Sequence, residues 1–322
     1  MDPLTNPITT ELARFEERLD VALQADVELV HEIARYMATL KGKRLRPVLA
    51  LLSGQACGRC DDRVIEAAVA VELIHGATVV HDDVVDSATM RRGRASVNSA
   101  WSGQLAVLMG DFLLARALSI LVDLGDLTAL RAVSRATERL SVGEIFEIQI
   151  GQRCDTRPDS YFSMVGDKTA SLISAAVRLG AILAGADDAV VTAMGEYGEN
   201  LGQAFQIADD VLDFTGDADT LGKPVGHDLK EGRITLPLIH ALEAAPPAER
   251  QAMEKVLRAG DKASADRAAI VDFVGRHGGV AAARATARDR AAGARRCLEA
   301  VPPSAARTSL ELAVRLVVER RY

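Results

Sequence analysis

Aromatic residues are scarce in this sequence. Only 4% of its 322 residues are Phe, Trp or Tyr, and runs in which β-branched residues alternate with polar ones are also rare. Residues that favour strands are therefore too few for a mainly β fold. Alanine, leucine, glutamate and arginine, which favour helices, dominate instead. The composition predicts an all-α protein.

Cysteine is scarce as well, with four residues in the chain, and only Cys57 and Cys60 lie close together in the sequence. A single Cys-x-x-Cys without a second pair or a βαβ pattern is a weak signal for zinc or redox chemistry. We expect free thiols in a reducing compartment. Residues 1–10 lack a basic segment followed by an apolar one, so no secretory signal is expected and a cytoplasmic location is predicted.

The chain carries a formal net charge of −7 at pH 7. This acidity argues against nucleic acid as a partner. It does not argue against an anionic substrate, because bound metal ions would neutralise the acidic clusters described below.

Apolar residues recur at intervals of three and four along most of the chain, which is the pattern of amphipathic helices. The expected helical stretches are residues 9–37 with a break near 25–26, 110–124, 127–152, 158–186 and 190–214. Residues 234–322 are expected to form further helices without recognisable chemistry. No Pro/Gly/Ser-rich linker divides the chain, so we expect a single domain over residues 1–322.

The run from residue 67 to residue 80, AAVAVELIHGATVV, is apolar on almost every side. A helix without a polar face is typical of the interior of a larger helical protein. The run is too short for a membrane-spanning helix and contains Glu72 and His75, so no transmembrane segment is predicted here.

Three carboxylates, Asp82, Asp83 and Asp86, follow this run directly. On a helix, Asp82 and Asp86 would stack on one face and Asp83 would lie about 100° away. Three ionised carboxylates this close repel one another unless a cation neutralises them, and Mg²⁺ prefers oxygen ligands. Alone, the motif could also be a solvated helix end.

The same Asp-Asp-x-x-Asp spacing recurs at Asp209, Asp210 and Asp213, again at the end of an apolar helical stretch. Two solvated helix ends with identical spacing would be a coincidence. Two such motifs facing each other across a helical bundle would instead hold several divalent ions that grip a diphosphate.

Basic residues gather in three segments of the chain. The first, KGKRLRP at residues 41–47, has a glycine at the turn and a proline near the start of the next helix, which suits an anion site, although a solvated basic turn would look alike. The second, Arg91-Arg92-Gly93-Arg94, follows the first carboxylate motif. The third lies in the Gly/Pro-punctuated stretch 215–233, a length typical of a functional lid.

These motifs together resemble those of bacterial trans-isoprenyl diphosphate synthases, the polyprenyl synthetases. The strings GKRLRP, ELIH…HDDVVD, RRG, GDF, DKTASL, GQAFQIADDVLDF, GKPVGHDL and ERRY occur in the order of that family over nearly the whole chain. The resemblance implies an all-α isoprenoid-synthase bundle around a deep apolar cavity. It also implies a transferase that joins isopentenyl diphosphate head-to-tail to an allylic diphosphate by ionisation, condensation and elimination, giving an all-trans product.

The resemblance assigns roles residue by residue. The diphosphate of isopentenyl diphosphate would be bound by Gly42, Lys43, Arg46, His75 and Arg92. The allylic diphosphate would be bound by Arg91, Lys168, Lys223 and Arg233, with Thr169 and Gln206 beside the cation. About three Mg²⁺ would be held by Asp82, Asp83, Asp86, Asp209, Asp210 and Asp213. The family commonly has lysine where this chain has Arg233, which keeps the charge but changes the geometry.

Product length in this family depends on bulk one helical turn and a little more before the first carboxylate motif. Ala77 and Thr78 occupy that position here and are small, so a long chain of the octaprenyl type is expected. Ile74, and Phe146 from a facing helix, are the next candidates for the end of the cavity. A geranylgeranyl-length product remains an alternative, because one deeper side chain could impose it.

Three other protein classes share parts of this pattern. A terpene cyclase would replace the second aspartate motif, and a carboxylate-bridged di-iron bundle would need Glu-x-x-His pairs, which we do not find. A non-catalytic subunit of a heteromeric synthase tends to lose aspartates, whereas all six are present here. The resemblance also implies a homodimer. The lipid product is compatible with peripheral membrane contact, for which no basic amphipathic helix argues.

Overall fold

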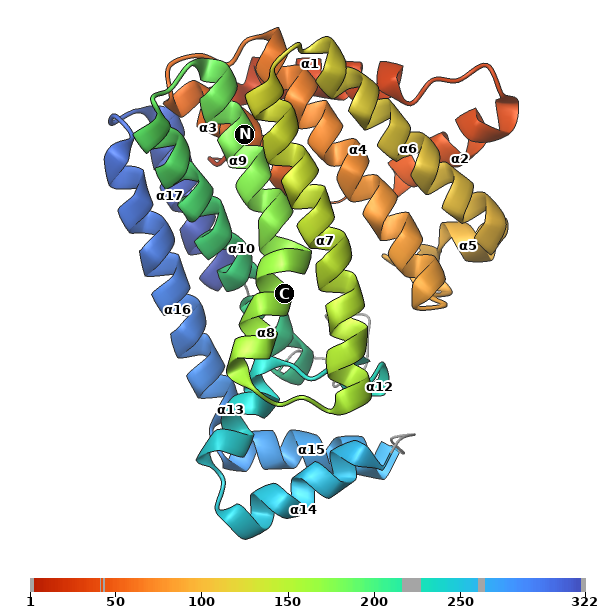
Figure 1. Ribbon diagram of the computed structural model, residues 1–322, viewed down its shortest axis with the longest axis vertical. Helices are drawn as coiled ribbons and strands as arrows, with labels where there is room; N and C mark the ends of the chain where they lie inside the picture. The colour runs from red at the N-terminus through yellow and green to blue at the C-terminus, as the bar shows by residue number, and fades with distance from the viewer. Residues whose placement is uncertain (1–2, 41, 43, 216–226, 260–263, 320–322) are drawn as a thin grey trace. The chain divides into compact units, whose positions relative to one another are not determined.

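The computed structural model describes residues 3–40, 42, 44–215, 227–259 and 264–319 of the chain. Its elements are almost all helical, which confirms the all-α prediction (Figure 1). In order they are η1 (Asn6–Ile8), α1 (Thr9–Ala22), α2 (Glu28–Thr39), α3 (Leu45–Ala56), α4 (Asp62–Val85), β1 (Met90–Arg91), β2 (Arg94–Ala95), α5 (Val97–Ala100), α6 (Gly103–Asp123), α7 (Leu127–Arg153), α8 (Pro158–Val165), η2 (Gly166–Ala170), α9 (Ser171–Ala184), α10 (Asp188–Thr215), α12 (His227–Lys230), α13 (Leu236–Ala244), α14 (Pro247–Arg258), α15 (Ser264–Arg276), α16 (Gly279–Cys297), η3 (Leu298–Ala300) and α17 (Ala305–Val318).

The chain divides into two compact units whose segments alternate along the sequence. The first unit comprises Met1–Thr137, Leu172–Gly198 and Cys297–Leu312, and the second comprises Glu138–Ser171, Glu199–Arg296 and Ala313–Tyr322. The single domain expected over residues 1–322 stays a prediction. Each unit is described separately below.

Helix α4 is the central helix of the first unit and packs against α1, α3 and α6 (Figure 1). Its interior is buried on all sides, as the run without a polar face predicts. The buried residues are Val64, Ile65, Ala67, Ala68, Val69, Ala70, Val71, Leu73, Ile74, Ala77, Val80 and Asp83. This packing places the first carboxylate motif at the last turn of a rigid helix.

Helix α6 begins at Gly103, so the expectation that a helix starts at Gly110 was wrong. Gly110 lies inside α6 where the helix crosses His81 of α4. A Cβ atom at Gly110 would lie 2.1 Å from Nε2 of His81, so only glycine allows this approach. The glycine therefore reflects helix packing rather than a helix end.

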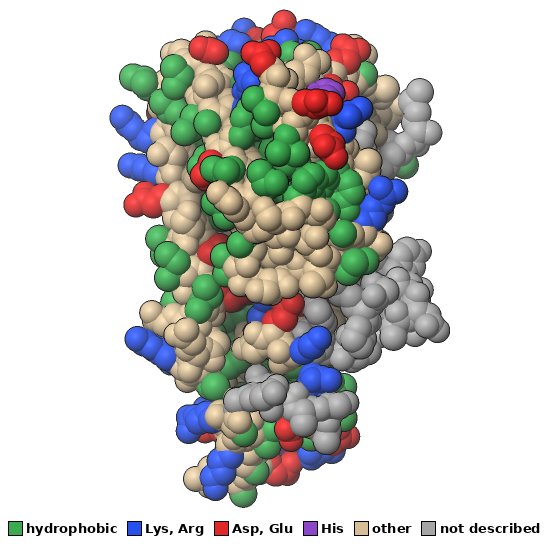
Figure 2. All heavy atoms as spheres, turned by 90° about the vertical axis from the view of Figure 1, so that its right-hand side faces the viewer, with side chains coloured by type: hydrophobic (Ala, Val, Ile, Leu, Met, Phe, Trp, Pro, Cys, Tyr) green, Lys and Arg blue, Asp and Glu red, His purple; other side chains and the backbone are tan. Residues whose placement is uncertain are grey.

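The opposite side of α6 exposes apolar side chains. Leu108, Leu118 and Val122 are 54%, 47% and 62% exposed, and their spacing places them on one face of the helix. Figure 2 shows the side of the molecule on which α6 lies, and hydrophobic side chains gather in its upper half. By length and composition alone, α4 and α6 could each cross a membrane, but 61% of the most apolar window of α4 is buried within the protein.

A two-residue turn separates the short strands β1 and β2. Arg91 pairs with Arg94, and the turn residues Arg92 and Gly93 have φ values of +52° and +77°. Positive φ at both turn positions is typical of a type I′ hairpin, whose twist matches that of the strands. The basic segment after the first carboxylate motif is thus a hairpin of fixed register.

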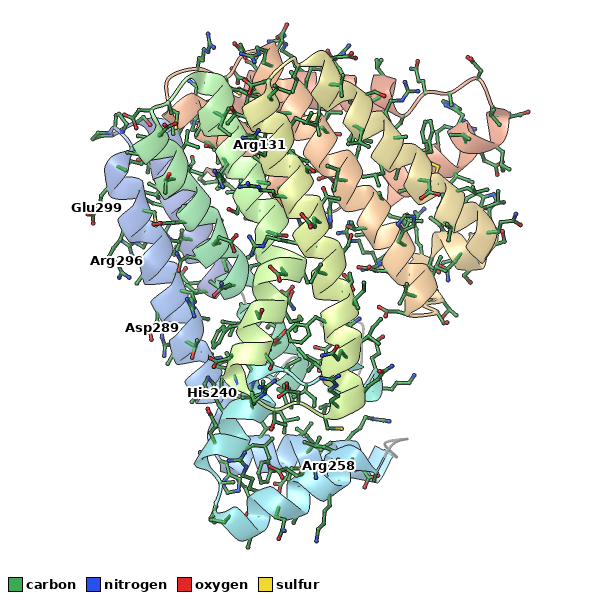
Figure 3. The ribbon with its side chains drawn as sticks, viewed as in Figure 1. Arg131, His240, Arg258, Asp289, Arg296 and Glu299 are labelled. Atoms are coloured by element: carbon green, nitrogen blue, oxygen red, sulfur yellow. The ribbon has the colours of Figure 1, made fainter. Side chains whose placement is uncertain are left out.

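Helix α16 packs in the second unit through a stripe of small residues. Ala283, Ala287, Ala291 and Ala294 are buried, whereas Asp289 and Arg296 project away from that stripe into solvent (Figure 3). His240 of α13 reaches α16, with Nε2 lying 3.2 Å from the hydroxyl of Thr286 (Figure 3). Helices α13 and α16 are therefore in direct side-chain contact.

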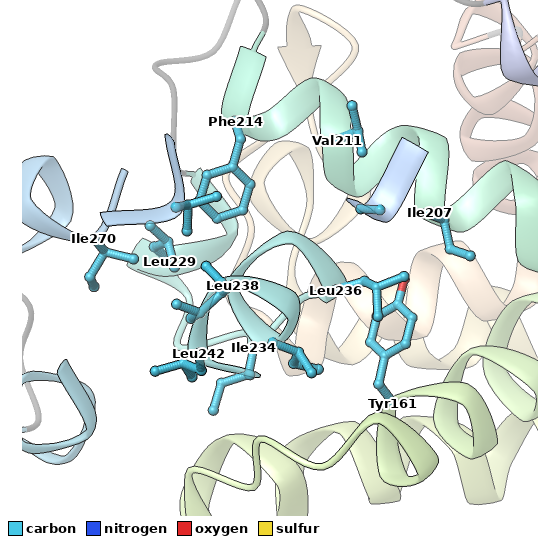
Figure 4. Packing of buried hydrophobic residues seen from close by; sticks show 14 of the residues in the cluster. Tyr161, Ile207, Val211, Phe214, Leu229, Ile234, Leu236, Leu238, Leu242 and Ile270 are labelled. Carbon is cyan, nitrogen blue, oxygen red and sulfur yellow. The ribbon is translucent and has the colours of Figure 1, made fainter. Parts of the chain in front are cut away.

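The second unit has its own apolar core, to which α7, α8, α10, α12, α13, α14, α15 and α16 contribute residues (Figure 4). Tyr161, Ile207, Val211 and Leu236 are among its members, and each is at most 4% exposed. Figure 4 shows Tyr161 at one edge of the labelled residues, with its hydroxyl group at the upper end of the ring. The core thus fixes a phenol whose polar end needs a partner.

The helix expected over residues 158–186 is interrupted by a π-helical turn, η2, at Gly166–Ala170. The N–H of Ser171 donates to the carbonyl of Gly166, five residues earlier, and the Ser171 hydroxyl donates to the Asp167 carbonyl at 2.5 Å. Such turns occur frequently at functional sites. This one carries Lys168 and Thr169.

A candidate active site

The first carboxylate motif ends helix α4. The N–H of Asp86 donates to the carbonyl of Asp82 at 2.8 Å, so these two residues lie one turn apart as the spacing predicts. Asp83 lies on another side, is only 3% exposed, and accepts hydrogen bonds from Nε and Nη2 of Arg91 at 3.0 and 2.6 Å. The middle aspartate is thus held by the hairpin.

The second carboxylate motif lies near the end of α10, and its middle aspartate is also held by the protein. Asp210 is 2% exposed, and its carboxylate accepts hydrogen bonds from the Tyr161 hydroxyl at 2.5 Å and from Nε2 of Gln206 at 2.9 Å. Burial, and next the charge of Asp228, raise the pKa of Asp210 to about 8. Asp213 accepts a hydrogen bond from the backbone N–H of Asp228 at 3.3 Å.

The three aspartates are arranged in the same way in the two motifs. In each, the middle aspartate is buried and bonded to protein, while the outer pair, Asp82 with Asp86 and Asp209 with Asp213, lies four residues apart. Among the described residues, no three carboxylate, imidazole or thiolate groups converge closely enough to hold an ion by themselves. Pairs of carboxylate oxygens nevertheless fit Mg²⁺, which keeps several waters and usually takes one or two protein carboxylates plus substrate phosphate oxygens.

A basic cluster lies beside α4 in the first unit. Nη1 of Arg46 lies 3.2 Å from Nε2 of His75, and Nη1 of Arg92 donates to the Leu40 carbonyl at 2.5 Å. A Cβ atom at Gly42 would lie 2.5 Å from Nη2 of Arg92, so the glycine makes room for that guanidinium. Three predicted residues and Gly42 are therefore brought together, whereas Lys43 lies outside the described residues.

The electrostatics of this cluster suit an anion. Burial, and next the positive charge of Arg46, lower the pKa of His75 well below its ordinary value, so the ring is neutral. Burial also lowers the pKa of Arg46 and of Arg92. Arg44, which the sequence analysis did not assign, adds a further guanidinium and forms an ion pair with Glu72. A bound anion would offset this concentration of positive charge.

A polar cavity of about 90 Å³ lies in the second unit. It is lined by Glu147, Ile150, Tyr161, Met164, Val165, Lys168, Thr169, Gln206, Asp210, Asp228, Arg233, Ile234 and Thr235. Four of the predicted site residues, Lys168, Thr169, Gln206 and Arg233, therefore share one cavity with Asp210. Among the described residues, none forms a hydrogen bond with the buried hydroxyl of Thr235, which leaves a polar group available to a ligand.

Lys168 is paired on one side of this cavity with two carboxylates. Its Nζ donates to Glu144 at 2.7 Å and to Glu147 at 2.6 Å. Burial opposes the charge on Lys168, but the two glutamates outweigh burial and raise the pKa of the ammonium group. Arg233 approaches Glu147 and Asp228, both at 3.8 Å. The cations of this cavity are fully charged and held by neighbouring carboxylates.

Thr169 and Gln206 are directly bonded to each other. The Thr169 hydroxyl donates to Oε1 of Gln206 at 2.9 Å, while the amide nitrogen of Gln206 serves Asp210. Gln206 thus connects the π-helical turn to the second carboxylate motif. Both residues line the cavity together with Lys168.

Several residues of the cavity were not assigned from the sequence. The sequence analysis gave no role to Tyr161, Glu147, Asp228 or Thr235, all of which line the cavity. Burial, and next the charge of Asp213, raise the pKa of Asp228 to about 6. Lys223 lies outside the described residues.

The residues proposed to set product length lie in different units. Ile74 and Ala77 are buried at 1% and 2% exposure in the first unit, and the Thr78 hydroxyl donates to the His75 carbonyl at 2.9 Å. Phe146 packs against the apolar core of the second unit.

Cys57 and Cys60 are free thiols, and burial raises their pKa values to about 11 and about 12, so both stay protonated.

Comparison with known proteins gives one family model, described as polyprenyl synthetase, which matches residues 27–274. The chain is 35% identical over 315 residues to the all-trans-nonaprenyl-diphosphate synthase (geranyl-diphosphate specific) of Rhodobacter capsulatus, covering 98% of this chain and 96% of that protein. It is 38% identical over 239 residues to the octaprenyl diphosphate synthase of Escherichia coli K12, with 74% of each chain covered. It is also 33% identical over 320 residues to a short chain isoprenyl diphosphate synthase of Methanothermobacter thermautotrophicus, covering 97% and 98%.

Solved structures give the same match. A polyprenyl synthase of Caulobacter crescentus CB15, complexed with calcium and isoprenyl diphosphate, superposes with a TM-score of 0.93 at 34% identity, covering 100% of this chain and 98% of that one. The likeness therefore extends over the full helical arrangement and both carboxylate motifs.

Proposed function

The chain belongs to the polyprenyl synthetase family, and we propose that this prenyltransferase extends an allylic diphosphate with isopentenyl units to a long all-trans product. One observation carries the proposal: two Asp-Asp-x-x-Asp motifs occur in one chain, and in each the middle aspartate is buried and bonded to protein. The outer two carboxylates of each motif lie one helical turn apart, on the same face of their helix.

We assign the outer aspartates, Asp82 with Asp86 and Asp209 with Asp213, as the Mg²⁺ ligands. Asp83 and Asp210 orient their motifs through Arg91 and Tyr161 rather than through a metal. When bound, Mg²⁺ would neutralise the allylic diphosphate and favour its departure. About three ions per site is the number that the family resemblance implies.

The basic cluster of the first unit would bind the diphosphate of isopentenyl diphosphate. Arg46 and Arg92 offer guanidinium groups, which suit phosphate oxygens because their donors form a planar fork. Because His75 is neutral, it can donate one N–H without adding a fourth positive charge to those of Arg44, Arg46 and Arg92. The cluster therefore suits the diphosphate group of isopentenyl diphosphate rather than its alkene.

The cavity of the second unit would act on the allylic substrate. Lys168 and Arg233 would contact its diphosphate. This contact would replace part of the ion pairing that both residues now have with Glu147. The oxygens of Thr169 and Gln206 would direct their dipoles at the carbocation, which is where preorganised dipoles have the largest effect. The released diphosphate would accept the final proton, so no protein base is required.

Product length follows from small side chains on α4. Ala77 and Thr78 leave room for an elongating chain, and the nonaprenyl and octaprenyl synthases among the relatives support a long product. The short-chain relative supports the alternative of a geranylgeranyl product, for which a bulky side chain such as Ile74 or Phe146 would end the cavity.

The exposed apolar face of α6, formed by Leu108, Leu118 and Val122, supports a homodimer. Single exposed apolar side chains are normal, but a continuous group marks an interaction surface. Leu108→Glu should convert a dimer to a monomer in sedimentation measurements, whereas Leu127→Glu outside this face should not.

A cytoplasmic location also remains our proposal.

One incubation tests the function. The purified protein, Mg²⁺ and radiolabelled isopentenyl diphosphate are combined with dimethylallyl, geranyl, farnesyl or geranylgeranyl diphosphate in turn, and the products are dephosphorylated and sized. A ladder that ends well beyond geranylgeranyl supports the proposal, and a single geranylgeranyl band supports the shorter alternative. No incorporation with any primer would favour a non-catalytic subunit of a heteromeric synthase.

Variants make this test specific for the metal ligands. Asp82→Asn and Asp209→Asn should each lower kcat by on the order of a hundredfold or more, because charge stabilisation of the leaving group is lost. Asp289→Asn, an equal change on the exposed side of α16 (Figure 3), should leave kcat unchanged.

A further inference from the structure

We propose that Arg139 of α7 is a positioning residue that locks the π-helical turn η2 so that Lys168 and Thr169 face the cavity. This inference deepens the proposed function and rests on it for its kinetic consequences. Arg139 does not line the cavity, and the sequence analysis gave it no role. It contacts Gly166 and Asp167, the first two residues of the turn.

Arg139 binds the turn at two points. Its Nε donates to the carboxylate of Asp167 at 2.7 Å, and its Nη2 donates to the carbonyl of Gly166 at 3.0 Å. The Gly166 carbonyl is the one that accepts the π-type bond from Ser171. The guanidinium therefore fixes both the backbone register of the turn and the side chain next to Lys168.

The other side of the same guanidinium is tied to α10. Nη1 of Arg139 donates to the carboxylate of Glu199, which makes a second contact with Nη2 at 3.4 Å. Burial opposes the charge on Arg139, but hydrogen bonds to Glu199 and Asp167 outweigh it and raise the guanidinium pKa. One charged group thus connects α7, the turn and α10.

Two glycines bring the same three elements into backbone contact. A Cβ atom at Gly143 of α7 would lie 2.4 Å from the backbone nitrogen of Lys168, and a Cβ atom at Gly202 of α10 would lie 2.5 Å from Cα of Ala170. The turn is therefore enclosed between two helices with no space to adjust. Arg139 lies one helical turn before Gly143, on the same face of α7.

This enclosure matters because a π-helical turn is not the default conformation. A return to an ordinary α-helix would remove one residue from the turn and rotate the following side chains by about 100°. Lys168 would then lose its alignment with Glu144 and Glu147, and Thr169 would lose its bond to Gln206. Besides the bonds from Arg139, close packing, the Ser171 hydroxyl and the bonds of Lys168 and Thr169 resist that change.

Kinetics and hydrogen exchange test the role together. Arg139→Met should lower kcat about ten- to a hundredfold, because displacements of about 1 Å in catalytic groups have effects of that size. The KM for isopentenyl diphosphate should stay within about twofold, since Arg46, His75 and Arg92 belong to the first unit and the turn belongs to the second. Amides of residues 166–171 should exchange about tenfold faster than in the wild-type protein.

Matched variants separate positioning from general charge effects. Arg131→Met removes an exposed arginine about two turns earlier on α7 (Figure 3) and should change neither kcat nor exchange at residues 166–171. Arg139→Lys keeps the charge but cannot reach Gly166, Asp167 and Glu199 at once. It should restore part of kcat and serves as the test if Arg139→Met fails to fold.

A double-mutant cycle tests the route through Asp167. If Arg139 acts through that carboxylate, Asp167→Asn should lower kcat in the wild-type background and have little further effect in Arg139→Met. Fully additive effects, or equal losses in Arg131→Met and Arg139→Met, would overturn the proposal, as would unchanged exchange. Inactivity of the wild-type protein with every primer would overturn the proposed function, while the exchange measurement would still decide whether Arg139 holds the turn.

Discussion

The hydroxyl of Tyr161 donates a hydrogen bond to Oδ2 of Asp210 across 2.5 Å, and both side chains are at most 2% exposed. The relationship parallels that of Arg91 with Asp83 at the other motif. Tyr161 belongs to the apolar core of the second unit, so the position of the carboxylate motif is coupled to the packing of that core.

Tyr161→Phe should raise the Mg²⁺ concentration needed for half-maximal activity about three- to tenfold. The reason is that Asp210 would keep only Gln206 as a side-chain donor and would no longer hold the outer aspartates in place. Tyr197→Phe is the matched control, because Tyr197 is equally buried and donates to the Leu310 carbonyl at 2.9 Å, away from this motif. Equal Mg²⁺ requirements in the two variants would contradict the role of Tyr161.

The metal-free protein should become less stable as the pH rises. Asp210 holds its proton in the folded state up to about pH 8 and Asp228 up to about pH 6, whereas aspartate in an unfolded chain releases it near pH 3.9. The folded state therefore binds more protons between these values, and the free energy of unfolding falls with rising pH.

The change should be visible in thermal unfolding with a chelator present. We expect Tm to be lower at pH 8.5 than at pH 5.5 by about 5 °C or more. Asp210→Asn should flatten the profile, because it removes the group that releases its proton near pH 8. A Tm that increases over this interval would refute the argument.

Lys168→Gln should lower kcat on the order of a hundredfold. The substitution removes the cation assigned to the allylic diphosphate and leaves Glu144 and Glu147 facing each other without it. Lys255→Gln, at an exposed position of α14, removes the same charge outside the cavity and should have no effect. Steady-state kinetics with a fixed primer distinguishes the two, and similar losses would mean that Lys168 acts only through net charge.

Ala77→Phe should shorten the main product to about farnesyl length. Ala77 is 2% exposed on the central helix of the first unit, so a large ring there would block the path of the growing chain. Overpacking costs about 1–3 kcal/mol of stability, and Tm should therefore be measured alongside. Sizing the dephosphorylated products gives the answer, and an unchanged distribution in a folded variant would exclude Ala77 from the chain-length wall.

Periodicity and spacing predicted much of this fold. The helix expected over residues 127–152 was found at Leu127–Arg153, and the one expected over 190–214 was found at Asp188–Thr215. Both lie where apolar residues recur at helical intervals. The start expected at Gly110 was wrong, because a glycine required by a crossing helix has the same sequence signature as a glycine at a helix end.

The charged ligands of the site could be predicted from the sequence, but the residues that hold them in place could not. Repeated aspartates are visible because spacing alone reveals the shared helix face. Tyr161 lies in an ordinary apolar segment, and Arg139 resembles any exposed arginine of an amphipathic helix. Their roles depend on which distant residue lies opposite, as Asp210 does for Tyr161, and local sequence does not contain that information.

The hairpin of β1 and β2 places two of its three arginines in different surroundings, Arg91 on Asp83 and Arg92 on Gly42 and the Leu40 carbonyl. Arg91 ends strand β1 and Arg92 is the first turn residue, so inserting or deleting one residue here would shift both guanidinium groups away from these partners. Ordinary surface loops tolerate length changes during evolution, and this one should not. Across the family, we expect sequence to vary in this segment while its number of residues stays constant.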